Sequence, residues 1–310
     1  MDKVREFIRK VNACVTDEDI WALVNSIVEE LSKGQDDKER TIGLVDGRKN
    51  CYEGGCYETF FTPKCKIKYD PMCPSYHFYD NDYLFSFIKY LKKLNIKETD
   101  SPMIIAGYVG SFLEWYFRRP AYDDKQDRRV EVMDAFSRDH ADEFYEKYKL
   151  PRMEDATCEQ QMDLAGEFPI SIFKFNGAAK CTEWSTMAHN LLLMCGYKSF
   201  CLWGDAFSNG QEEYHAWNVV KANEELYFLI DYSNGSIRSL NGITQRIDPY
   251  VVPLTKEEFE LFKSGKLVIE KPEVTYDGSK RVEDDGNRRR YVTGKSFERI
   301  EKEQAEEPQR

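Results

Sequence analysis

Hydrophobic positions recur at helical spacing through the first third of the chain. Residues 3–15 form one amphipathic segment. Thr16, followed by a run of acidic residues, supplies a cap and an acidic first turn for a second helix that reaches residue 32, and Gly34 ends it. Similar signals predict helices over residues 83–94, 103–118 and about 130–148. Residues 1–150 are therefore expected to be mainly helical.

Residues 35–79 interrupt this pattern, because Gly, Pro, Tyr and Cys occur there with no sustained period. We expect an irregular segment with at most a short hairpin. A zinc site is the alternative for its polar residues, but their spacing matches no common C-x-x-C pairing, so free thiols are favoured and no metal is expected. The candidate ligands are Cys51, Cys56, Cys65, Cys73 and His77.

From about residue 168 the pattern changes to one helix followed by strands. Apolar residues over 180–195 form a helical stripe that Gly196 ends. Residues 199–203, 214–221 and 226–231 are rich in β-branched or aromatic side chains, which is typical of strands. The pattern predicts an α+β fold in which residues 151–271 form the core, with its helix packed on an antiparallel sheet.

Beyond residue 271 charged residues dominate, so residues 272–310 are expected to be a charged, largely disordered tail that is dispensable for folding. Tyr291 and Val292 are the exception, since they could add one edge strand to the sheet.

Composition excludes several classes of function. The 310 residues carry a net charge of -11, and no basic cluster has interleaved aromatics, so no nucleic-acid partner is expected. The longest apolar stretch, residues 103–117, is too short to span a bilayer and includes Glu114, so no membrane partner is expected. The charged N-terminus resembles no export signal, and nine cysteines without a disulfide spacing favour reduced thiols in the cytoplasm.

Cys181, His215 and Asp231 are the residues that could carry chemistry. Cys181 opens the helix of residues 180–195, where the positive end of the helix dipole favours a thiolate. His215 begins an apolar strand, and Asp231 ends the next one, where it could orient the imidazole. Taken singly, these residues are as well explained by a core cysteine, a satisfied core histidine and a turn-capping carboxylate.

The hairpin that joins the two strands imposes a geometric condition. Side chains alternate between the faces of a sheet, so pairing His215 opposite Asp231 requires a connection of three residues, 222–224, or of five. A two-residue turn would pair His215 with Tyr232 and place Asp231 on the other face.

Residues 168–234 resemble the core of the transglutaminase-like superfamily in order, spacing and expected secondary structure. The resemblance rests on Cys181-Thr-Glu-Trp-Ser, on His215-Ala-Trp-Asn-Val and on Leu229-Ile-Asp231. It implies a catalytic triad of Cys181, His215 and Asp231, with Glu183 and Trp184 where the family often has an acid and an aromatic residue. One departure is that Ala179 stands where the family usually has glycine. Arylamine acetyltransferases and papain-like peptidases fit less well in motif and order.

The resemblance implies acyl transfer or amide hydrolysis through a thioester, with a protein or peptide amide as substrate and no cofactor. The backbone N–H of Cys181 is one expected oxyanion donor, and Gln161 is favoured over Gln160 and Trp115 as the second. Whether water or an amine attacks the thioester is open, as is the oligomeric state. The alternatives are a binding or scaffolding protein that keeps the fold without turnover, and an effector whose N-terminal helices contact a host protein.

Overall fold

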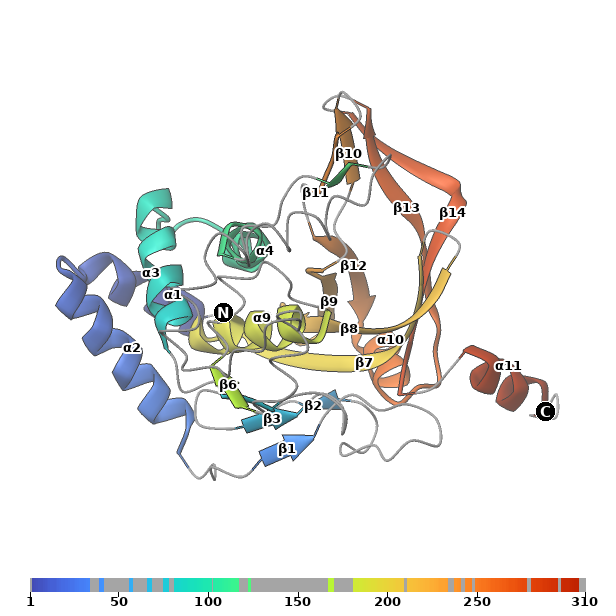
Figure 1. Cartoon of the computed structure of the whole chain (residues 1–310), viewed down its shortest axis with the longest axis horizontal. Coiled ribbons are helices and arrows are strands. Elements are labelled where there is room, and N and C mark those ends of the chain that lie inside the picture. Colours follow the sequence, from blue (N-terminus) through green and yellow to red (C-terminus); the bar gives the residue numbers. More distant parts are fainter. Residues whose placement is uncertain are drawn as a thin grey trace, which may run out of the picture.

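The computed structural model (Figure 1) describes part of the chain. The described residues are 2–33, 39–41, 56–57, 66–68, 75–77, 81–101, 103–116, 122–123, 167–169, 181–208, 211–233, 237–240, 243–246, 249–277, 280–294 and 297–306. The helix expected over residues 130–148 and most of the irregular segment 35–79 lie outside these ranges.

Four helices form the N-terminal layer, as the hydrophobic pattern predicts. The Thr16 side chain accepts a hydrogen bond from the Asp19 N–H, and the Asp19 carboxylate accepts one from the Thr16 N–H, which completes a capping box. Among the helices of the described ranges, none combines the length and apolar character that a bilayer crossing requires. The four helices are α1 (Asp2–Ala13), α2 (Asp17–Leu31), α3 (Asp82–Leu94) and α4 (Ile104–Tyr116).

The larger of the two sheets in the described residues curls until it is nearly closed, with α1, α2, α3 and α4 on one side of it (Figure 1). Adjacent strands are antiparallel except for β10 and β13, so the fold is α+β as expected. In spatial order its strands are β12 (Tyr250–Thr255), β9 (Leu226–Asp231), β8 (Gln211–Lys221), β7 (Lys198–Ser208), β14 (Lys280–Thr293), β13 (Ile269–Asp277), β10 (Ile237–Leu240), β11 (Ile243–Arg246) and β5 (Tyr122–Asp123), and β2 (Cys56–Tyr57) also pairs with β7.

A smaller sheet lies apart from this one. Its strands are short and pair in the order β1 (Glu39–Thr41), β3 (Lys66–Lys68), β4 (Ser75–His77) and β6 (Glu167–Pro169).

Helix α9 (Cys181–Met194) packs between the N-terminal helices and one face of the large sheet. Trp203, Ala216 and Ile230 of the sheet join the core on that face. The opposite face forms a second core around Trp217 and Tyr291, which α10 (Lys256–Lys263) covers. The two cores are separate because neighbouring residues of β8 point to opposite faces.

Gly196 ends α9, as predicted, and its positive φ of 88° explains the choice of residue. The Tyr197 N–H donates to the Leu192 carbonyl at 3.0 Å and the Gly196 N–H to the Leu193 carbonyl at 2.9 Å, which is a Schellman motif. A Cβ at this position would also lie 2.8 Å from the Cβ of Lys3. The end of α9 and the start of α1 are therefore in close contact.

The described residues after Lys271 are folded, so the expectation of a disordered tail is wrong for them. Strand β14 lies inside the sheet between β7 and β13, and α11 (Phe297–Glu306) follows it. Arg289, Tyr291 and Val292 are almost fully buried, whereas Arg288 is exposed. Charged residues that alternate with buried ones in a strand give a sequence that resembles a polar tail. The expected edge strand around Tyr291 and Val292 is an interior strand.

The β8–β9 hairpin has the odd connection that the triad requires, but its register differs from the expected one. Asn218 pairs with Ile230 and Lys221 with Tyr227, so the turn consists of residues 223–225. The Asn223 side chain accepts a hydrogen bond from the Leu226 N–H at 2.9 Å, which stabilises this turn. Continued along the strands, the register places His215 opposite Ser233. Asp231 is therefore diagonal to His215 and on the same face.

Candidate functional site

Cys181 is the first residue of α9, as predicted, and it is partly exposed. The helix behind it is fixed to the sheet, because the Asn218 side chain donates a hydrogen bond to the Ser185 carbonyl at 3.0 Å. Trp184 and Met187 of the same helix are buried in the core. The thiol therefore stands at a rigidly held helix N-terminus, where the helix dipole favours negative charge.

His215 is buried, and its Nε2–H donates a hydrogen bond to Asp231 Oδ2 at 2.8 Å. The Cys181 thiol lies within hydrogen-bonding reach of the same imidazole. Burial opposes the imidazolium, but the charge of Asp231, the charge of Cys181 and the hydrogen bonds to both hold the pKa of His215 well above its ordinary value. Because Nε2 is bonded to Asp231, Nδ1 is the nitrogen left to exchange a proton with the thiol.

Asp231 is fully buried, and its carboxylate accepts hydrogen bonds on both oxygens. Ser233 donates to Oδ1 through its hydroxyl at 2.9 Å and its N–H at 3.2 Å, and the Tyr291 hydroxyl donates to Oδ2 at 2.9 Å. Burial alone would raise the pKa of Asp231. The charges of His215 and Arg289 and the hydrogen bonds from His215 and Tyr291 lower it instead to about 2. The carboxylate is therefore ionised at neutral pH.

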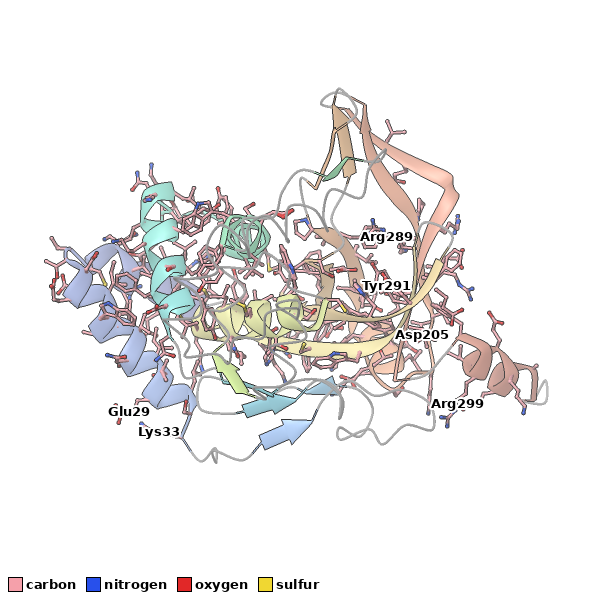
Figure 2. All side chains as sticks on the ribbon, viewed as in Figure 1. Glu29, Lys33, Asp205, Arg289, Tyr291 and Arg299 are labelled. Atoms are coloured by element: carbon pink, nitrogen blue, oxygen red, sulfur yellow. The ribbon has the colours of Figure 1, made fainter. Side chains whose placement is uncertain are left out.

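Arg289 and Tyr291 belong to this site although sequence reasoning assigned them to the tail. Figure 2 shows both side chains on β14, on the inner side of the curled sheet. The Arg289 guanidinium carbon lies 4.7 Å from the centre of the Tyr250 ring. Burial, followed by the charge of Asp231, raises the pKa of Tyr291 well above its usual value, so its hydroxyl remains a donor. The sequence signal near them is the pair Tyr291 and Val292, which predicts a strand, but it does not connect Arg289 or Tyr291 with Asp231.

Glu213 is a further residue that sequence reasoning missed. Its carboxylate Oε1 lies 3.8 Å from His215 Nδ1, and its side chain is 54% exposed. It precedes His215 by two residues in β8, which places both on one face of the strand. The imidazole nitrogen that is not bonded to Asp231 therefore has an exposed carboxylate beside it.

The candidates for a second oxyanion donor are only partly described. Gln161 and Gln160 lie outside the described residues. Trp115 is on α4, 56% exposed, and its ring is stacked with that of Tyr90 at a centroid distance of 6.5 Å. The side chain of Glu183 is outside the described part of the chain.

The zinc alternative also falls largely outside the described ranges, which include Cys56 and His77 but not Cys51, Cys65 or Cys73. Among the described residues, His, Cys, Asp and Glu form no group of three or more that could hold a metal ion.

No family model, curated protein or solved structure matches the chain. The chemical interpretation therefore rests on the residues themselves. A thiol at a helix N-terminus, an imidazole within hydrogen-bonding reach and an ionised carboxylate behind the imidazole are the parts that nucleophilic catalysis by cysteine requires.

Proposed function

We propose that the protein catalyses acyl transfer or amide hydrolysis with Cys181 as nucleophile, and that α9 and strands β7, β8 and β9 belong to a transglutaminase-like core. The observation that carries the proposal is the single line of contacts from Cys181 through His215 to Asp231. A structural cysteine would not need a buried imidazole whose second nitrogen is bonded to an ionised carboxylate. A protein or peptide amide is the substrate that this chemistry suits.

In the proposed reaction the Cys181 sulfur attacks the carbonyl carbon of the amide, and the thiol proton passes to Nδ1 of His215. The tetrahedral intermediate collapses as its C–N bond breaks, and Nδ1 returns the proton to the leaving amine. A thioester remains on Cys181. Water or a second amine then attacks the thioester, gives a proton to Nδ1 and releases the thiolate, which recovers that proton. Asp231 fixes the orientation of the imidazole and stabilises the imidazolium.

The oxyanion of the intermediate needs donors near the sulfur. The N–H of Cys181 is one of the groups at the start of α9 that have no partner within the helix, and it can serve as the first donor. Gln161 is proposed as the second.

The test is the rate at which iodoacetamide alkylates each cysteine at neutral pH, followed by peptide mass spectrometry. Cys181 should react faster than a free thiol, whereas Cys14, Cys195 and Cys201 are buried and serve as internal controls. His215→Ala should slow Cys181 by at least about 10-fold, since an adjacent base typically contributes 10²–10⁴-fold. A Cys181 that reacts no faster than glutathione would refute the proposal and favour a binding or scaffolding protein.

The substrate class requires a second experiment. Incubation with a peptide library, followed by denaturation and mass spectrometry of the Cys181 peptide, should reveal a covalent acyl adduct. The matched control is Cys181→Ala, which should carry none.

A further inference from the structure

Glu213 lies beside the nitrogen that, in the proposed mechanism, exchanges a proton with the leaving or attacking amine. In the proposed mechanism that amine exchanges a proton with Nδ1 of His215, so it comes within about 3 Å of that nitrogen. The Glu213 carboxylate lies 3.8 Å from the same nitrogen and is half exposed, so it faces the solvent through which substrate arrives. A charged group close to the reacting amide would therefore interact with this carboxylate.

Among the described residues of the site, the buried charges lie opposite one another, whereas Glu213 is half exposed. The charge of Arg289 lowers the pKa of the buried Asp231 and compensates its carboxylate. In the thioester both the sulfur and the imidazole are neutral. Glu213 then adds an exposed negative charge beside the neutral imidazole.

We propose that Glu213 makes the site selective for cationic substrates, namely peptide amides that carry an ammonium or guanidinium group next to the reacting bond. This inference rests on the proposed function, because it requires Cys181 to be the nucleophile. Glu213 is half exposed, so water and salt screen its charge and the expected selectivity is modest.

The experiment compares three methanethiosulfonate reagents that carry a positive, a negative or no charge. In each, the Cys181 thiolate attacks the disulfide-like sulfur, forms a mixed disulfide and releases methanesulfinate, so no further co-reactant is needed. The probes are the trimethylammonium-ethyl, sulfonatoethyl and uncharged methyl reagents. The measured quantity is the ratio of the cationic to the anionic rate at Cys181, divided by the same ratio for an uncharged free thiol in solution.

For the native chain this ratio should exceed one, and Glu213→Gln should lower it by about 5-fold at low salt, as expected for one exposed charge acting on probes of opposite sign. Glu213→Lys should lower it further. Glu225→Gln is the matched control, because Glu225 is exposed in the β8–β9 turn, ten residues along the chain from His215, and it should leave the ratio near the native value. In 1 M salt, where the Debye length is about 3 Å, the effect of Glu213→Gln should shrink.

The outcomes separate the two proposals. If Cys181 reacts slowly with all three reagents, the proposed function fails. If Cys181 reacts readily with the uncharged reagent but Glu213→Gln leaves the ratio unchanged, or Glu225→Gln lowers it equally, the selectivity assigned to Glu213 is wrong while the nucleophile stands.

Discussion

Tyr291→Phe tests whether strand β14 supports the candidate site, because it removes one hydroxyl and leaves the buried ring. That hydroxyl donates to Asp231 Oδ2 at 2.9 Å, the oxygen that also accepts from His215. A hydrogen bond to a charged group contributes about 1.5 to 3 kcal/mol. The free energy of unfolding at pH 7 should fall by about that amount, which corresponds to a Tm lower by about 2 to 5 °C in a chain of this size.

The loss of unfolding free energy in Tyr291→Phe should depend on pH, and the ionisation of Asp231 determines the direction of that dependence. The pKa of Asp231 is depressed to about 2 in the folded protein, whereas an unfolded aspartate titrates near 3.9. The ionised carboxylate therefore stabilises the fold above pH 4, and this contribution is lost as the pH falls towards 2. Removing the Tyr291 donor should raise the pKa of Asp231 by about one to two units. The difference between the variant and the native chain should then shrink below pH 4.

Urea denaturation followed by tryptophan fluorescence at pH 7 and pH 3 measures this effect. Tyr250→Phe is the matched control, because the Tyr250 hydroxyl donates at 3.3 Å to the uncharged carbonyl of Pro272. Its loss should be smaller, about 0.5 to 1.5 kcal/mol, and nearly independent of pH. Equal penalties for the two variants at pH 7, or a Tyr291→Phe penalty that persists undiminished at pH 3, would contradict the role assigned to this hydrogen bond.

Three further predictions follow from the same contacts. Gly204→Ala should prevent β7 from pairing with β14, because its Cβ would collide with the Val292 carbonyl. Urea denaturation should show a far larger loss of stability for this variant than for Gly107→Ala, since a Cβ at Gly107 meets nothing within 4 Å. Truncation after Lys271 removes all of β14, so it should expose apolar surface, seen as dye binding and aggregation; a truncated chain with native Tm would refute this. The raised pKa of His215 predicts that its imidazole titrates at a higher pH than that of an exposed histidine; ¹⁵N NMR, assigned with His215→Gln, measures this, and titration at or below the pH of an exposed histidine would contradict it. Since that pKa is raised on folding, its stabilising contribution is complete below about pH 6.5 and is lost as the pH rises through the folded value.

The parts of the fold that the sequence predicts are those set by local rules. The capping box at Thr16, the glycine that ends α9 and the helix that begins at Cys181 depend on neighbouring residues, and all three are present. The even separation of His215 and Asp231 requires an odd turn if they share a face, and the hairpin has one. Its register is two residues away from the expected one, because the Asn223 side chain stabilises a turn one residue further along the chain.

The parts that the sequence does not predict are those that depend on distant partners. Arg289 has the composition of a polar tail, and it is buried where the negative charge of Asp231 compensates its own. Tyr291 is 60 residues from the carboxylate it binds, so no local pattern connects them. Nothing in the sequence distinguishes Glu213 from other glutamates. Only the structure shows that its carboxylate lies beside the His215 imidazole.

The candidate site therefore depends both on contacts between elements that are close in the sequence and on contacts with an element far along the chain. Cys181, His215 and Asp231 come from α9 and the β8–β9 hairpin, which follow one another closely along the chain. The groups that keep Asp231 ionised come from β14, which reaches the site only after it has paired between β7 and β13. Loop closure over a longer chain carries a larger entropic cost, so this pairing is expected to form later than the hairpin. A chain that lacks β14 would retain the three triad residues in sequence but would lose the buried donor and the positive charge that make the carboxylate an orienting group.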